Sequence, residues 1–308
     1  MTYSTGNLVV HDDYNIFATG SASGAENLSV ANINSLWGVG QGDKGYGQTS
    51  PPIVTPVSIG QIITSGQWSV LLARMRSIAS HEGVSIPAIV DPFGVQITPL
   101  SSLNSNISVI NSNRLSCFSN GSDQVDNTLT NGGSPWFSTA THTINAVFST
   151  YDNMRYYFNT GGKLRFSFSM SGSGGTPAGT RDIWINLLNA SGTIELAATS
   201  TSRLGGWGSA SILASSTGFH QIGAGTVVLF RKYDPLSYIP DTGDYVELTA
   251  TGNSGTPNII TFVARYVNTA SFIANTITTT HTARPPETTY IANSWGGYTF
   301  SAGSNSQG

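Results

Sequence analysis

The segment "KLRFSFSMSG", residues 163–172, indicates the fold class most clearly. Its apolar side chains Leu164, Phe166, Phe168 and Met170 alternate with arginine and serine. Alternate residues of a β-strand lie on the same face of a sheet, so one face of this segment is apolar and the other is polar. That alternation is typical of an antiparallel strand that packs on a core with one face only.

Similar segments recur through residues 114–308. They are "HTINAVF" (142–148), "GTIEL" (192–196), "TVVLF" (226–230), "YVELTA" (245–250), "NIITFVARYV" (258–267) and "FIANTITTT" (272–280). Short helices are expected between them over 152–158 and 181–192, while the tail 296–308 is expected to be loose or intermolecular. Many short strands separated by turn residues favour a mainly antiparallel β-sandwich.

The first third of the chain has helical periodicity instead. In "ITSGQWSVLLARMRSIASHEG" (63–83), Trp68, Leu71 and Met75 fall on one helical face with other apolar residues. Thr64 and Gln67 match a capping box, and the glycine at 83 is placed to end the helix. We therefore expect a packed helix over this stretch.

A second helix is expected over "TPLSSLNSNISVINSNR" (98–114). Leu100, Leu103, Ile107 and Ile110 step by three, four and three residues, the spacing of a packing seam. This serine- and asparagine-rich helix needs a partner, either the Trp68 helix or a neighbouring subunit. A weaker third candidate covers residues 25–38. The expected fold is thus α+β, with a helical docking and oligomerisation module over 1–113 and a β-sandwich over 114–308.

The composition restricts the classes of partner. Only 9 % of the 308 residues are charged and the net charge is −3, so hydroxyl and amide groups must cover most of the surface. Such a surface suits a protein covered by its neighbours. Nucleic-acid binding is not expected because clustered cations are missing. No stretch approaches the roughly 18 apolar residues of a membrane span, so no membrane insertion is expected. The start of the chain does not resemble a signal peptide, and Cys117 is the only cysteine.

The stretch "GVGQGDKGYGQ" (38–48) matches the dinucleotide-binding pattern G-x-G-x-x-G at Gly40, Gly42 and Gly45. That fingerprint must follow a strand and open a helix. Here a helix-like segment precedes it and a proline-rich segment follows. We therefore expect no cofactor and interpret Gly40, Gly42, Gly45 and Gly47 as a structural turn anchored by Trp37 and Tyr46.

Other candidate motifs are equally weak. The five histidines are scattered, so no metal site is expected. The carboxylates Asp234, Asp241, Asp244 and Glu247 could include a glycosidase pair, but turn chemistry explains them better. "DPFG" (91–94) is interpreted as a turn.

Three tryptophans stand in glycine- and serine-rich surroundings. Trp136, Trp207 and Trp295 are expected to anchor an interface, with stacking on sugars as the alternative.

The combination of "GVGQGDKGYGQ" with "ITSGQWSVLLARMRSIASHEG" resembles the amino-terminal signature of virion structural proteins in large contractile-tailed, cyanophage-like bacteriophages. The segments "THTINAVFSTYDNMRYYFNTGGKLRFSFSMSG", "WINLLNASGTIEL", "DYVELTATG" and "ARPPETTYI" resemble the β-rich domain that often follows. The resemblance covers most of residues 30–300. It implies a place in the neck, tail, baseplate or fibres and brings no catalytic residues with it.

The expected function is therefore that of a non-enzymatic virion component, made in the host cytoplasm, which assembles with itself and with other virion proteins. In this hypothesis the helical module docks to the particle, and the β-sandwich faces outward or bridges neighbours. A host-surface glycan adhesin is the alternative, and a glycan-degrading enzyme is a third hypothesis.

Overall fold

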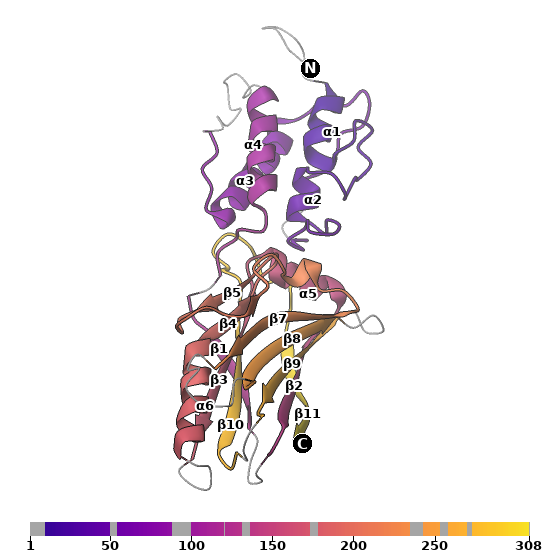
Figure 1. Ribbon diagram of the computed structural model, residues 1–308. Helices are drawn as coiled ribbons and strands as arrows, with labels where there is room; N and C mark the ends of the chain where they lie inside the picture. The colour runs from indigo at the N-terminus through magenta and orange to yellow at the C-terminus, as the bar shows by residue number, and fades with distance from the viewer. Residues whose placement is uncertain are drawn as a thin grey trace. The chain divides into compact units, whose positions relative to one another are not determined.

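The structure is a computed structural model that describes residues 10–49, 54–87, 100–119, 121–130, 136–172, 178–234, 243–252, 258–269 and 273–307 (Figure 1). The chain forms two compact units. Unit 1 comprises Met1–Asn120, Arg155–Gly161 and Pro286–Trp295, and unit 2 comprises Gly121–Met154, Gly162–Pro285 and Gly296–Gly308. The first boundary lies near the expected one at 113/114, but unit 1 also includes two later segments.

The described part of unit 1 begins with the helices α1 (His11–Thr19), α2 (Ile33–Trp37), α3 (Ser65–Glu82) and α4 (Leu100–Asn113). The expected capping box of α3 is present, because the Thr64 side chain accepts from the Gln67 amide while Gln67 accepts from the Thr64 amide. Gly83 ends the helix in the left-handed conformation, with φ of 69°. Trp68, Leu71 and Met75 are buried as expected.

Helix α4 packs against α3 and α1 of the same chain. Leu103, Ile107 and Ile110 are buried there, while the side chain of Leu100 lies outside the described residues. The seam is thus already covered within one chain, so it gives no support for contacts between subunits.

The expected helix over residues 25–38 is shorter in the structure. Only Ile33–Trp37 is helical, because Asn32 caps it by accepting a hydrogen bond from the amide of Ser35. Residues 28–30 form a turn instead.

Two buried asparagines hold the extended segment that precedes α3. The amide group of Asn15 donates to the carbonyl of Val57 and accepts from its N–H, at 2.9 and 2.8 Å. Asn34 makes the same pair of bonds with Val54, at 2.9 and 2.9 Å. Each asparagine side chain therefore satisfies both the N–H and the carbonyl of one residue in this extended segment, as a neighbouring β-strand would.

Unit 2 is the expected mainly antiparallel sandwich with helices, and the fold as a whole is α+β. Among the described residues, one sheet has the order β1-β10-β3-β4-β5 and the other β11-β2-β9-β8-β7-β6 (Figure 1). The first sheet contains β1 (Gln124–Thr130), β10 (Thr276–Arg284), β3 (Lys163–Ser171), β4 (Thr193–Leu196) and β5 (Thr201–Leu204). The second contains β11 (Tyr298–Gln307), β2 (Thr139–Phe148), β9 (Ile259–Val267), β8 (Tyr245–Gly252), β7 (Thr226–Tyr233) and β6 (Ile212–Leu213).

The core of unit 2 lies between these sheets. Phe166 of β3 meets Phe262 of β9 with ring centroids 4.4 Å apart. The hydroxyl of Thr279 on β10 lies 2.7 Å from His142 Nδ1 on β2 and 2.6 Å from the Tyr266 hydroxyl on β9. Because both partners come from the opposite sheet, this buried hydrogen-bonded group helps to fix how the two sheets face each other.

Three helical elements accompany the strands: α5 (Tyr151–Asn159), α6 (Ala178–Ser191) and the short 3-10 helix η1 (Phe219–Gln221). Helix α6 contacts β3 of one sheet and β7 and β8 of the other. Its Trp184 is fully buried against Trp136, with ring centroids 5.3 Å apart. Helix α5 contributes residues 151–154 to unit 2 and 155–159 to unit 1.

The expectation of a loose C-terminal tail is wrong, because residues 298–307 form the edge strand β11. It pairs antiparallel with β2 from Tyr298 opposite Phe148 to Gln307 opposite Ala140, with a bulge between Ala302 and Asn305. Backbone pairing with an exposed edge supplies stability that a serine- and glycine-rich pattern does not reveal.

Candidate functional site

The glycine-rich segment 38–48 forms the structural turn that the sequence predicts. Gly40, Gly42, Gly45 and Gly47 have φ values of 52°, 64°, 95° and 67°, which disfavour any residue with a side chain. The N–H groups that follow bond within the chain: Tyr46 donates to Leu36, Gly47 to Gly38 and Gln48 to Trp37. These amides are thus not directed at an anion, as a phosphate-binding loop requires. Trp37 and Tyr46 are buried, as expected for anchors.

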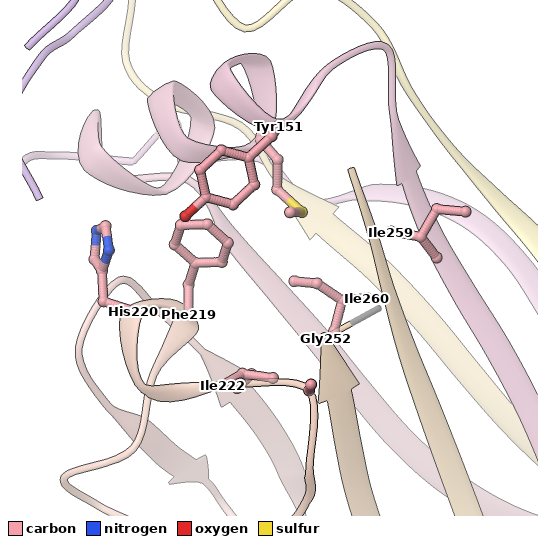
Figure 2. A pocket seen from close by; sticks show the side chains of 10 residues that line it. Tyr151, Phe219, His220, Ile222, Gly252, Ile259 and Ile260 are labelled. Carbon is pink, nitrogen blue, oxygen red and sulfur yellow. The ribbon is translucent and has the colours of Figure 1, made fainter. Parts of the chain in front are cut away.

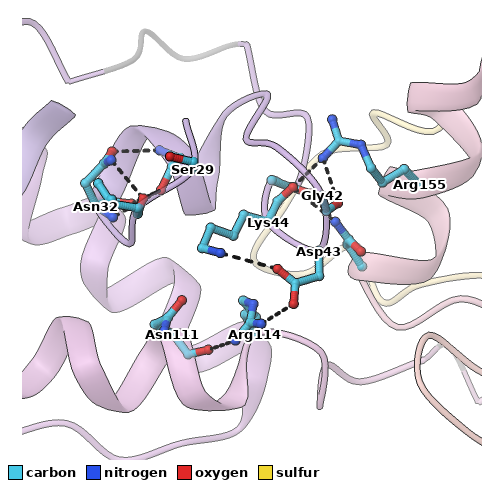
Figure 3. A network of polar contacts seen from close by, with 12 residues as sticks. Ser29, Asn32, Gly42, Asp43, Lys44, Asn111, Arg114 and Arg155 are labelled. Carbon is cyan, nitrogen blue, oxygen red and sulfur yellow. Dashed lines mark hydrogen bonds and ion pairs between the residues drawn. The ribbon is translucent and has the colours of Figure 1, made fainter. Parts of the chain in front are cut away.

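Arg155 occupies the inside of this turn. Its guanidinium donates to the carbonyl of Val39 at 2.7 Å, to that of Gly42 at 3.4 Å and to that of Lys44 (Figure 3). Asn159, one helical turn further along α5, donates to Gly45 at 3.0 Å. The turn thus presents carbonyl oxygens inward, and a cation of the same chain satisfies them. No sequence pattern indicated this pairing, because the two segments are more than a hundred residues apart.

Asp43 continues the network on the outer side of the turn. It forms ion pairs with Lys44, at 3.4 Å, and with Arg114 (Figure 3). Partial burial disfavours its charged form, but the hydrogen bond and charge of Arg114 outweigh that effect, and its pKa lies below the ordinary value. Asp43 and Lys44 are therefore engaged in holding the turn closed.

A second buried polar cluster lies beneath the turn. The Tyr46 hydroxyl lies 2.8 Å from Glu82 Oε1, 2.9 Å from the Arg114 carbonyl and 3.2 Å from the Cys117 sulfur. Burial raises the pKa of Glu82 to about 8, against the opposing effects of the Tyr46 hydrogen bond and the Arg114 charge. Burial also raises the pKa of the Cys117 thiol, so it is a poor nucleophile. The cluster is thus a buried neutral group rather than a reactive centre.

The histidines and carboxylates are dispersed. Within the described ranges, no three His, Cys, Asp or Glu side chains gather in a way that could hold a metal ion. Asp244 accepts from the backbone and hydroxyl of Thr269, and Glu247 pairs with Arg231. Asp241 lies outside the described residues. The carboxylates seen here therefore have structural partners.

The three candidate tryptophans differ in exposure. Trp207 is 48 % exposed, as a contact residue should be, while Trp136 and Trp295 are only 1 % and 3 % exposed. The expectation of surface contacts is corrected for these two, because glycine-rich surroundings in the sequence did not reveal their burial. Trp136 instead fills the core of unit 2 beside Trp184.

Unit 1 displays an exposed apolar turn, formed by residues 58–62. Ile59 and Ile62 are each 85 % exposed, on either side of Gly60, whose φ is 82°. The turn is held by the Gln61 amide, which donates to the Ser58 carbonyl at 3.1 Å. It lies between Val57, which Asn15 clamps, and the capping box of α3. Sequence reasoning missed this feature, because solvent exposure of a short apolar segment depends on the tertiary structure.

Unit 2 contains a cavity of about 190 Å³, lined by α5, η1 and the ends of β8 and β9 (Figure 2). Aromatic side chains form one wall and aliphatic side chains another. Tyr151 and His220 contribute the side-chain hydroxyl and ring nitrogens among the lining residues. The sequence pattern did not indicate a cavity here.

Comparisons with protein-family models, curated proteins and solved structures found no match to this chain. None of the helices in the described ranges is both long and apolar enough to cross a membrane.

Proposed function

We propose that this chain is a structural, non-enzymatic component of a tailed-phage virion, located in the neck, tail, baseplate or fibres. It works by assembly, joining copies of itself and neighbouring virion proteins. The resemblance of the glycine-rich turn and α3 to phage virion proteins supports this proposal, and so does the low content of charged residues. In the proposal, unit 1 docks to the particle, while unit 2 faces outward or bridges neighbours.

The observation that carries the assembly role is the exposed turn 58–62. A partner that covered these two isoleucines, each 85 % exposed, would remove their apolar surface from water, which is favourable. Full burial of an isoleucine contributes roughly 1.5–3 kcal/mol. Because hydrogen bonds on both sides already order the turn, little conformational entropy is lost on binding. The turn is therefore a preorganised contact for an apolar hollow on another protein chain.

The first experiment asks whether the protein is a virion component. Mass spectrometry of purified particles from the phage that encodes the chain should detect it in a fixed proportion to other virion proteins. Electron microscopy of intact particles should then place it. Absence from purified particles would overturn the proposal.

The second experiment tests the turn itself. The double variant Ile59→Ser/Ile62→Ser should fold like the wild type, since both side chains are exposed, yet enter particles at least tenfold less efficiently. Val70→Ser, at a position of α3 that is 37 % exposed, is the matched control and should enter normally. Normal incorporation of the double variant would exclude the turn as the docking contact.

A host-surface glycan adhesin remains the alternative. Exposed Trp207 favours it, since an indole face stacks on sugars. The burial of Trp136 and Trp295 leaves Trp207 without the aromatic neighbours that this alternative predicted. A glycan array probed with wild type and Trp207→Ala separates the two functions: selective glycan binding lost in the variant would favour the adhesin.

A further inference from the structure

The cavity of unit 2 is partly open to solvent and has a volume suited to one ring. Its volume is about 190 Å³. A cavity of about 150 Å³ lined by leucine, isoleucine and phenylalanine stays dry and takes a benzene molecule. The cavity in unit 2 is therefore large enough for a single six-membered ring with a small substituent.

Three neighbouring aromatic rings, those of Tyr151, Phe219 and His220, form one wall of the cavity. The rings of Tyr151 and Phe219 lie with centroids 6.2 Å apart and an interplanar angle of 39°. Those of Phe219 and His220 are 4.9 Å apart at 63° (Figure 2). Such tilted arrangements leave ring faces and edges available to a further aromatic ring, which prefers offset or edge-to-face contacts.

The opposite side is aliphatic and partly bare backbone. Ile222, Ile259 and Ile260 supply the apolar surface. The amide of Gly252 donates to the carbonyl of Gly223 at 2.9 Å, and a Cβ atom at position 252 would come within 3.0 Å of that oxygen. Glycine at this position thus allows the two backbones to meet closely and keeps this wall flat.

From this geometry we infer that the cavity is a binding site for one aromatic ring of the phenol type. The ring lies between the aromatic wall and the isoleucines, and its hydroxyl faces the Tyr151 hydroxyl and the His220 imidazole. Among the residues that the structure describes, the lining includes no Asp, Glu, Asn, Gln or Arg. A sugar needs several such partners for its hydroxyls, so the lining favours a ring with a single polar group over a sugar. This inference does not rest on the virion role.

The test uses p-cresol as the probe and the purified full-length chain. Ligand-observed NMR should show saturable binding of p-cresol, with binding of cyclohexanol and methyl glucoside at least tenfold weaker. Ala224→Phe places a bulky ring at the lining, and Tyr151→Ala removes part of the aromatic wall. Both positions are exposed, so the fold should persist, and each variant should weaken p-cresol binding at least tenfold. Ala210→Phe, at an alanine outside the lining, should bind like the wild type.

Two outcomes would overturn the inference. One is the absence of saturable p-cresol binding to the wild type. The other is a p-cresol affinity that stays unchanged in both cavity variants, or an affinity for cyclohexanol or methyl glucoside that equals the affinity for p-cresol. When binding is confirmed, incorporation of Ala224→Phe into particles identifies the source of the ring. A loss of incorporation indicates a tyrosine side chain of a neighbouring protein, and normal incorporation indicates a free phenolic compound. Since binding is measured on the isolated protein, failure here is distinguishable from failure of the virion role.

Discussion

The guanidinium of Arg155 donates to the carbonyl of Val39, which lies 116 residues earlier in the chain, at 2.7 Å. Arg155 is only 4 % exposed, and its guanidinium also donates hydrogen bonds to the carbonyls of Gly42 and Lys44. Gly40, Gly42, Gly45 and Gly47 of this turn have positive φ, and the carbonyls that accept from Arg155 are partly buried. The shape of the turn therefore depends on a residue of α5 that completes unit 1 from a distant part of the sequence.

Replacing Arg155 should consequently destabilise unit 1. Arg155→Leu removes the charged donor from three carbonyls that are only partly buried, so water can replace part of the lost bonding. A hydrogen bond to a charged group contributes about 1.5–3 kcal/mol, and we expect the free energy of unfolding in urea to fall by about 1–3 kcal/mol. Arg181→Leu, at an arginine of α6 that forms a partly exposed ion pair with adjacent Asp182, should change it by about 0.5 kcal/mol or less. A loss below 1 kcal/mol at position 155 would contradict this role.

The clamp between Asn15 and Val57 predicts a second loss. Asn15→Ala removes both hydrogen bonds and leaves the Val57 amide and carbonyl buried, so stability should fall by about 2–4 kcal/mol. Hydrogen exchange at the Val57 amide should accelerate in parallel. Asn104→Ala, on the exposed face of α4, serves as the control and should leave this exchange unchanged. An unaltered exchange rate in Asn15→Ala would show that the clamp is dispensable.

Glu82 makes unit 1 sensitive to alkaline pH. Its folded-state pKa of about 8 exceeds the ordinary 4.5, so the folded state retains a proton that the unfolded state releases. This contribution to stability is present below pH 4.5 and is lost as the pH rises through about 8. Glu82→Gln keeps a neutral group of the same shape and should abolish this slope, which makes the variant more stable than the wild type at pH 9 by on the order of a few kcal/mol.

Urea unfolding between pH 5 and pH 9 measures this effect. Glu26→Gln, at an exposed carboxyl of the same unit, should keep the wild-type slope. Parallel curves for the wild type and Glu82→Gln would refute the assignment.

Two buried histidines make unit 2 sensitive to acid. Burial lowers the pKa of His142 and of His281 to about 4, below the ordinary 6.5. The unfolded state therefore binds more protons between these values, and stability present at neutral pH is lost as the pH falls from 6.5 through 4.

The two histidines should nevertheless respond differently to substitution. In the described part of the chain, neither ring nitrogen of His281 has a hydrogen-bond partner, so His281→Leu should be neutral or stabilising at pH 7 and should reduce the acid sensitivity. His142→Leu removes the bond to Thr279 and should cost about 1–2 kcal/mol at pH 7. Thermal unfolding at pH 7 and pH 5 distinguishes them, and a large loss in His281→Leu at pH 7 would be the contrary result.

The division into units determines how a truncation that isolates the sandwich should be designed. Deleting residues 1–113 removes the carbonyl partners of Arg155, and residues 155–161 and 286–295 lose the rest of unit 1. A folded sandwich is therefore expected only when Arg155 and the apolar residues near it are replaced by polar ones. Circular dichroism and incorporation into particles would test the sandwich apart from unit 1.

Elements with local signals could be predicted from the sequence alone. Thr64, Gln67 and Gly83 set the ends of α3, and the alternation around Phe166 established a half-buried strand, because capping and side-chain periodicity act within a few residues. Four features depend on tertiary contacts instead: the pairing of β11 with β2, the burial of Trp136, the exposure of Ile59 and the place of Arg155 inside the glycine-rich turn. Each of these depends on contacts between segments distant in the chain, and no local pattern specifies which buried carbonyl will meet which distant donor.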